Sequence, residues 1–187
     1  MKLILASASP RRAELLRAAG IEFDVMPANI DETMDAEEWP DGYVRRIAQT
    51  KAESIKPLAY GRPVLAADTI VIVDSKVLGK PTDANDAKRM LRLLSGREHT
   101  VMTAVYLAYL SAQVRVERTV VRFAPLTDAE IERYVASGEC LDKAGAYAIQ
   151  GLASRFVTRI DGSYSNVVGL PVALVYELCT KAGLLIS

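Results

Sequence analysis

The chain has 187 residues, half of them hydrophobic and a quarter charged, which is the composition of a globular protein able to bury a core of its own. Its 23 Lys and Arg balance its 23 Asp and Glu, so the formal net charge is zero. A neutral chain lacks the broad basic field that non-specific nucleic-acid binding uses, and the hydrophobic content excludes intrinsic disorder. We therefore expect an ordinary folded protein with no nucleic-acid partner.

The cysteines and the apolar runs indicate the cellular compartment of the protein. Cys140 and Cys179 lie far apart in a chain too long to need a disulfide framework, so we expect buried thiols in a reducing environment. The apolar run near the N-terminus is too short for a signal peptide, and no run approaches the length of a membrane span. These features predict a cytoplasmic protein without membrane contact.

Hydrophobic spacing predicts helices and strands that alternate along most of the chain. The expected strands cover 2–6, 22–26, 64–73, 101–110, 114–123 and 156–160, and the expected helices cover 10–20, 42–55, 83–94, 127–138 and a last segment from 171. The run 64–73 is nearly continuous in apolar, β-branched residues, which is typical of a central strand covered on both faces. Thr127 and Glu130 form a capping box. The order predicts a single domain over 1–187 of the α/β class, mixed α+β, with a mixed sheet.

Two charged residues interrupt these predicted core segments. Asp68 stands within the apolar run 64–73, where an unpaired carboxylate is costly, so it must meet a cation, a metal or several donors. It is either a hydrogen-bonded core aspartate or a general base or metal ligand. Lys51 falls inside the apolar stripe of helix 42–55, where a lysine snorkels to water or pairs with an acid. Both are candidate site residues.

Several residues have the chemistry of phosphate binding. Ser7, Ser9, Arg11 and Arg12 gather where the first strand meets the first helix, and hydroxyls, guanidinium groups and free backbone N–H groups there suit a polyphosphate. Lys80, which follows a turn, is a further candidate for a point charge on phosphate. The alternative interpretation is a plain helix cap with solvated basic side chains.

The remaining polar candidates are isolated in the sequence. Glu32, in an acidic stretch after the second strand, could face Asp68 and complete a carboxylate pair for Mg²⁺, or could be solvated. Gln150 carries an amide that can donate to and accept from the edge of a base. His99 is the only histidine, which excludes a His-rich zinc site and argues against a Ser-His-Asp triad. Any metal would therefore be a hard cation held by carboxylates, with Mg²⁺ expected before Mn²⁺.

Short blocks spread over nearly the whole chain form a specific combination. They are LASASPRR at 5–12, IDE at 30–32, KA at 51–52, ADTIV at 67–71, LGKP at 78–81, LSG at 94–96, DKAGAY at 142–147, IQG at 149–151 and VGLP at 168–171. Together they resemble the Maf family of nucleoside triphosphate pyrophosphatases. The resemblance implies an ITPase-like fold, with an elongated mixed central sheet and helices in two lobes around a cleft. It also implies cleavage of a nucleoside triphosphate to the monophosphate and pyrophosphate.

The resemblance further implies roles for individual residues. Asp68 is expected to be the proton acceptor and, together with Glu32, a ligand of the metal. The specificity positions are expected to be Arg11, Thr69 and Gln150. The residues that match the phosphate and metal-site positions of the family are Ser7, Arg12, Glu32, Lys51 and Lys80. Within the family, SPRR, ADT and AYxIQG favour the branch that acts on dTTP and UTP, in a nucleotide house-cleaning role.

Two other functions stay open from the sequence. One is a non-catalytic module that senses nucleotide or nucleic acid in cell-division control, because the historical name of the family refers to septum formation. The other is a pyrophosphatase for purine or 7-methyl-GTP substrates on the same fold. The chain could act as a homodimer. The zero net charge of the chain argues against nucleic-acid binding. A pair of carboxylates facing phosphates needs a metal between them, which favours the enzyme over the sensing module.

Overall fold

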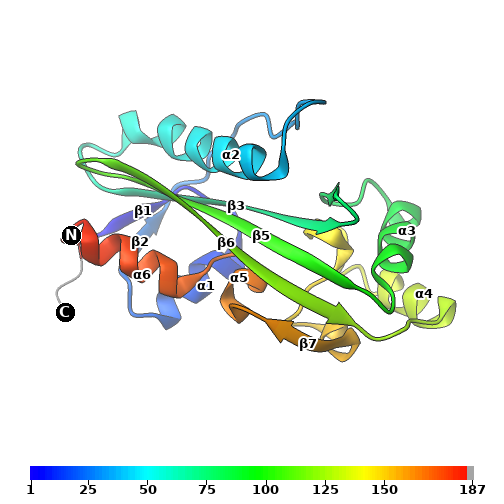
Figure 1. Ribbon diagram of the computed structural model, residues 1–187. Helices are drawn as coiled ribbons and strands as arrows, with labels where there is room; N and C mark the ends of the chain where they lie inside the picture. Colours follow the sequence, from blue (N-terminus) through cyan, green and yellow to red (C-terminus); the bar gives the residue numbers. More distant parts are fainter. Residues whose placement is uncertain (185–187) are drawn as a thin grey trace. The chain divides into compact units, whose positions relative to one another are not determined.

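The computed structural model describes residues 1–184, which form alternating strands and helices (Figure 1). The strands are β1 (Leu3–Leu5), β2 (Phe23–Val25), β3 (Val64–Val73), β4 (Lys76–Leu78), β5 (Glu98–Ala108), β6 (Ala112–Phe123) and β7 (Val157–Asp161). The α-helices are α1 (Pro10–Ala18), α2 (Pro40–Ile55), α3 (Ala84–Leu94), α4 (Asp128–Ala136), α5 (Tyr164–Val168) and α6 (Val172–Lys181). Three 3-10 turns are η1 (Lys56–Leu58), η2 (Ala144–Ala146) and η3 (Leu152–Phe156).

The described strands join in one mixed sheet. Its order is β2-β1-β3-β5-β6-β7, and β4 pairs with β3. β1 is parallel to both β2 and β3, whereas β3 with β4 and β6 with β7 are antiparallel. The chain divides into two compact units: unit 1 comprises residues 1–68, 103–117 and 169 onward, and unit 2 comprises 69–102 and 118–168. The strands β3, β5 and β6 contribute residues to both units.

In unit 1 the residues of β3 alternate between the two faces of the sheet. Leu65 and Ala67 belong to the core that β1 and β5 form with α1 and α6, which lie on one side of the sheet (Figure 1). Because successive strand residues point to opposite faces, Asp68 points to the other face, which α2 covers. The buried strand therefore delivers a carboxylate beneath the helix that carries Lys51.

In unit 2 a glycine brings a loop against the second half of β3. Gly145, in η2, has φ +69°, and a Cβ built on it would lie 2.9 Å from the side chain of Val71. Only glycine combines that backbone conformation with so close an approach. The segment 144–151, which contains the predicted specificity residue Gln150, is therefore held beside β3.

The sequence predictions for the fold are largely confirmed. The class is mixed α/β with a mixed sheet, and β3 matches the predicted central strand residue for residue. The capping box of Thr127 and Glu130 is present, and Cys140 and Cys179 are buried and free. The elements that the sequence did not predict are β4, α5 and the three 3-10 turns. Each spans only three to five residues, too few for a hydrophobic period to show.

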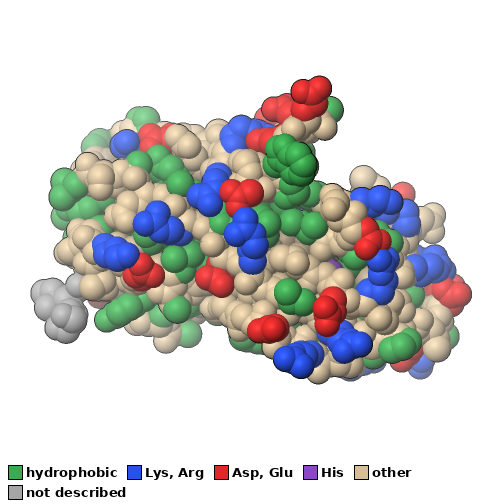
Figure 2. All heavy atoms as spheres, viewed as in Figure 1, with side chains coloured by type: hydrophobic (Ala, Val, Ile, Leu, Met, Phe, Trp, Pro, Cys, Tyr) green, Lys and Arg blue, Asp and Glu red, His purple; other side chains and the backbone are tan. Residues whose placement is uncertain are grey.

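The surface carries charges of both signs. Figure 2 shows acidic and basic side chains interspersed over the visible face, in keeping with a net charge of zero. The loop ahead of α2 is acidic and exposed at Asp31, Glu32, Asp35 and Glu37. No helix within residues 1–184 is both long enough and apolar enough to span a membrane.

Candidate active site

Lys51 is the centre of a charged cluster in unit 1. Helical spacing places it on the buried face of α2, and its side chain is only 9% exposed. The ammonium donates to Oδ1 of Asp68 at 2.8 Å and pairs with Oε1 of Glu32, also at 2.8 Å. Lys51 therefore does not snorkel to water. It joins the two carboxylates that the sequence analysis expected to face each other.

Burial has the largest effect on the pKa of Asp68, whose side chain is also 9% exposed. Removal from water raises the pKa of this carboxyl above its ordinary value, while the charges of Lys51 and Arg12 oppose the rise and Glu32 adds to it. A carboxylate with increased proton affinity is suited to accept a proton. Lys51 donates to Oδ1 of Asp68 and not to Oδ2.

The loop that carries Glu32 is fastened to α2. Tyr43 donates its hydroxyl to the backbone oxygen of Glu32 at 2.7 Å, and Arg46 donates to the backbone oxygen of Thr33 at 3.0 Å. Burial, with the negative charges of Asp68 and Glu32, raises the pKa of Tyr43 to about 12, so its hydroxyl remains a donor at neutral pH. The Glu32 side chain, which is 42% exposed, thus reaches the buried pair from a restrained loop.

The junction between β1 and α1 gathers Ser7 and Arg12. The Oγ of Ser7 accepts from the backbone N–H of Ser9 and from Nη1 of Arg12, both at 3.2 Å. The Nε of Arg12 donates to the carbonyl oxygen of Gly169 at 2.8 Å. Burial lowers the pKa of Arg12, whereas the attraction of the two carboxylates of the cluster opposes that shift. The guanidinium is therefore within electrostatic range of the Lys51 cluster.

Two further candidates lie at the same junction. Ser9 occupies the N-cap of α1, but its side chain makes no capping hydrogen bond. Arg11, on the first turn of α1, is near enough to Arg12 to lower the pKa of that guanidinium by repulsion. Phosphate binding by Ser9 and base recognition by Arg11 stay predictions.

The other predicted site residues belong to unit 2. Lys80 and Gln150 are exposed, and Thr69 is partly buried. The backbone N–H of Gly145 donates to the carbonyl oxygen of Gly79 at 3.0 Å. The segment that carries Lys80 is therefore tied to the loop that contains Gln150. The roles of these residues in phosphate and base recognition stay predictions.

Comparison with known proteins decides the family. The family model of Maf-like proteins matches residues 2–182. This chain belongs to the Maf family. It is 51% identical over 193 residues to the dTTP/UTP pyrophosphatase of Shewanella sp. (strain MR-7), with 98% of this chain and 100% of that protein covered. It is 50% identical over 186 residues to the dTTP/UTP pyrophosphatase of Koribacter versatilis (strain Ellin345), with 99% of this chain and 96% of that protein covered.

A solved structure shares the fold of this Maf protein. The Ham1 protein of Staphylococcus aureus aligns with a TM-score of 0.55 at 14% identity, over 97% of this chain and 100% of that chain. At this identity the likeness concerns the fold alone. The family and the ITPase-like fold class predicted from the sequence blocks are confirmed.

The donor set of the Maf site fits a magnesium ion that also binds phosphate. Glu32 and Asp68 each place an oxygen 2.8 Å from the same ammonium, so the two carboxylates share one small region. Within residues 1–184 there is no group of three or more His, Cys, Asp or Glu side chains able to hold a metal. Mg²⁺ commonly takes one or two protein carboxylates and completes its shell with water and substrate phosphates. The pair fits that mode of binding.

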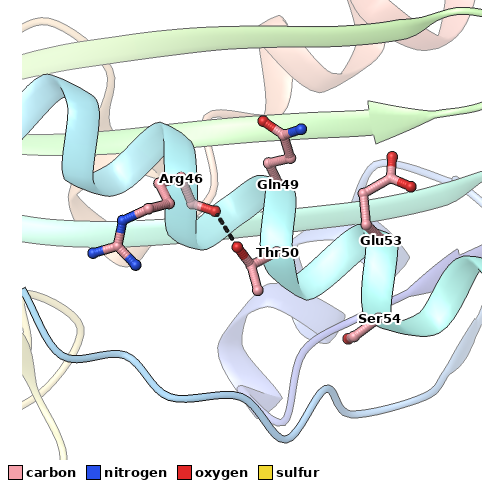
Figure 3. Close-up of a pocket in the computed structure, with 5 residues that line it drawn as sticks. All are labelled: Arg46, Gln49, Thr50, Glu53 and Ser54. Atoms are coloured by element: carbon pink, nitrogen blue, oxygen red, sulfur yellow. Dashed lines mark hydrogen bonds between the residues drawn. The ribbon is translucent and has the colours of Figure 1, made fainter.

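A surface hollow of about 530 Å³ lies elsewhere on α2 (Figure 3). The residues that line it are Arg46, Gln49, Thr50, Glu53 and Ser54. None of the predicted site residues is among them, because Lys51 occupies the buried stripe of the helix. The lining of the hollow therefore does not include the Lys51 cluster.

Two residues that shape the Maf site were not found by sequence reasoning. Tyr43 lies on the buried stripe of α2, two turns before Lys51, and a tyrosine there needs a partner for its hydroxyl, which is a usable signal. Gly169 acts through its carbonyl oxygen, which no pattern of side chains reveals. In the sequence it is part of the block 168–171.

Proposed function

We propose that this Maf protein hydrolyses dTTP and UTP, and related modified pyrimidine triphosphates, to the monophosphate and pyrophosphate, as a nucleotide house-cleaning enzyme. The observation that carries the proposal is the Lys51 ammonium between Asp68 and Glu32, with Arg12 in electrostatic range. The near full-length relatives named dTTP/UTP pyrophosphatase support the same substrates.

Asp68 is the proton acceptor in the proposed reaction. The oxygen of a water molecule bonds to phosphorus, the anhydride bond between the α and β phosphates breaks, and the proton of the water passes to Asp68. Burial raises the pKa of Asp68, which strengthens it as a base, and Oδ2 is the oxygen that Lys51 leaves uncovered. A positioned general base contributes roughly a hundredfold to ten-thousandfold to a rate.

The cationic side chains neutralise the charge that builds on the triphosphate. An ammonium has three N–H donors; Lys51 directs one of them to Asp68 and pairs by charge with Glu32, and a remaining donor can bind a phosphate oxygen. Arg12 and Lys80 supply further positive charge, and Ser7 and Ser9 supply hydroxyls at the helix start. Fixed donors of this kind need no reorganisation when the bond breaks.

Glu32 and Asp68 would hold the divalent cation, Mg²⁺ or Mn²⁺. When bound, such an ion supplies charge neutralisation at the phosphate oxygens. The ion would share these two carboxylates with Lys51, so that Asp68 would serve both as ligand and as proton acceptor.

Base choice is assigned to Arg11, Thr69 and Gln150. The carboxamide of Gln150 can donate and accept together, which matches the mixed edge of uracil or thymine. Cytosine has an amino donor where uracil has an acceptor, so it would leave polar groups of such a site unpaired. Gln150 is exposed on its loop and is therefore accessible to a ligand.

The sensing module and the purine pyrophosphatase are not favoured, because the relatives share a pyrimidine pyrophosphatase name. A cytoplasmic location, the absence of a nucleic-acid partner, a homodimeric state and a single domain over 1–187 stay predictions. The last three residues of that range lie outside the described part of the chain.

The test is release of pyrophosphate from a panel of nucleoside triphosphates, with Mg²⁺, with Mn²⁺ and with neither ion. We expect turnover of dTTP and UTP above CTP, ATP and GTP, and only in the presence of metal. Turnover of none of them, with binding of nucleotide retained, would favour the sensing module. Preference for a purine triphosphate would favour the purine enzyme.

A further inference from the structure

His99 is a buried titratable residue that the proposed mechanism does not use. It lies near the start of β5 in unit 2 and is only 3% exposed. Its Nε2 lies 2.8 Å from the hydroxyl of Tyr147, which comes from a segment 48 positions further along the chain. Its other ring nitrogen, Nδ1, is buried without a hydrogen-bond partner among the described residues. The bond to Tyr147 is therefore the one hydrogen bond of this imidazole in the described part of the chain.

Tyr147 belongs to the segment that presents Gln150, called here the Gln150 loop (residues 144–151). Its ring is buried and meets two other rings edge to face: Phe123 at 4.8 Å and His99 at 5.3 Å between centroids. His99 and Phe123 meet in the same way at 5.0 Å. Burial raises the pKa of Tyr147 and lowers that of His99 to about 4, so both partners are neutral at pH 7. Edge-to-face contacts among three rings and one neutral hydrogen bond hold Tyr147 in place.

A second anchor holds the backbone on both sides of Gln150. The hydroxyl of Tyr134 accepts from the backbone N–H of Ala148 at 3.1 Å and donates to Oε1 of Glu139 at 3.0 Å. The other oxygen of Glu139 accepts from the backbone N–H of Leu152 at 2.9 Å. Gln150 itself remains exposed between these fixed points. Selective hydrogen bonding to a ligand requires an exposed amide on a restrained backbone. Because the loop is already ordered in the free protein, binding loses less conformational entropy.

We propose that His99 and Tyr147 are positioning residues, whose buried hydrogen bond sets the conformation of the Gln150 loop and thereby the discrimination between pyrimidine bases. The proposal rests on the proposed function in that it assigns base choice to Gln150. It goes beyond that function because both side chains are buried and act through the loop. Its consequence is that loss of this bond changes selectivity more than it changes the chemistry at phosphate.

Two single variants test the bond. Tyr147→Phe removes the hydroxyl and keeps the ring, and His99→Phe removes the imidazole nitrogens and keeps an aromatic ring. Each is expected to lower the ratio of kcat/KM for UTP over that for CTP by about fivefold, the size of one net hydrogen bond. Hydrogen exchange of the free protein should show faster exchange at the amides of Ala148 and Gly151.

The double variant separates positioning from stability. With both polar partners gone, no buried group is left unsatisfied, so the melting temperature should return to that of the wild type. Selectivity should stay reduced, because the ring contacts remain but the directional bond does not. A merely structural role predicts instead that selectivity recovers together with the melting temperature. His99→Gln, whose amide can reach the position of Nε2, should restore selectivity in part.

Two controls complete the design. Tyr106→Phe, in unit 1, also removes a tyrosine hydroxyl bond, to Glu53 at 3.0 Å, and should leave the ratio unchanged. In a Gln150→Ala background, Tyr147→Phe should cause no further loss of selectivity, because the effect passes through Gln150.

Unchanged selectivity in both single variants, or amide exchange at Ala148 and Gly151 equal to the wild type, overturns the proposal. So does a further loss in the Gln150→Ala background. If the wild type releases no pyrophosphate from any triphosphate, the proposed function fails, and the exchange measurement still decides whether the bond fixes the loop.

Discussion

Replacement of Lys51 by methionine tests the charged cluster most directly. Lys51→Met keeps a side chain of similar length on the buried face of α2 but removes the ammonium that bridges Asp68 and Glu32. Glu32 is 42% exposed, so water can solvate its charge at little cost. Asp68, with a side chain 9% exposed, would be left as a buried carboxylate without its nearest cation. We expect the variant to be less stable than the wild type and to lose nearly all turnover.

The loss of stability has an upper bound, because Asp68 can take up a proton instead of remaining charged. Protonating a carboxyl of ordinary pKa 3.8 costs about 4 kcal/mol at pH 7 and about 2 kcal/mol at pH 5, at 1.36 kcal/mol per pH unit. Arg12 still attracts the charge, so the measured cost should lie below these values. A group whose folded pKa is raised binds its proton more tightly in the folded state, so stability is lost as pH rises. The deficit of Lys51→Met should therefore grow between pH 5 and pH 7.

Urea unfolding of the wild type and Lys51→Met at pH 5, 6 and 7 measures this difference. The matched control is the double variant Lys51→Met with Asp68→Asn, in which the buried charge is absent. It should regain most of the stability, show a deficit independent of pH, and remain inactive. A deficit in Lys51→Met that is the same at pH 5 and pH 7, or that Asp68→Asn does not relieve, would refute the assignment of the buried charge to Asp68.

Three further predictions concern single residues. Asp68→Asn should retain the circular dichroism of the wild type and lose roughly a hundredfold or more in pyrophosphate release, as expected for a general base, and turnover within a few-fold of wild type would make Asp68 only structural. His99 is neutral in the fold because burial lowers its pKa from 6.5 to about 4, so the unfolded chain takes up the proton first and stability falls as pH drops from about 6.5 toward 4, by about 2 kcal/mol at pH 5. Urea unfolding of the wild type and of His99→Phe measures the share of the pH dependence that His99 causes. An equal change of unfolding free energy with pH in the two proteins would contradict the prediction. Gln150→Ala should reduce the preference in kcat/KM for UTP and dTTP over CTP, mainly by slowing the preferred substrates, and equal proportional losses on every nucleotide would assign Gln150 to phosphate or fold.

The sequence by itself determined the parts of this protein that depend on local period and on residue type. The apolar run of β3 and the helical stripe of α2 were found because their residues repeat with the periods of a buried strand and a helix. Against those periods, Asp68 and Lys51 stood out as charges in buried positions, and the sequence blocks gave the family. That a buried charge must find a partner follows from solvation alone.

Only the tertiary structure decided which partner each group found. Lys51 bonds Asp68 across 17 positions, His99 bonds Tyr147 across 48, and Arg12 bonds the carbonyl of Gly169 across 157. Such contacts depend on which strands pair and which helix covers which face, and no local pattern records either. His99 shows the limit, because in the sequence it precedes an apolar run like any surface residue, whereas the fold closes an aromatic cluster around it. The packing of distant segments removes water from these side chains, and that removal gives the site its protonation and its geometry.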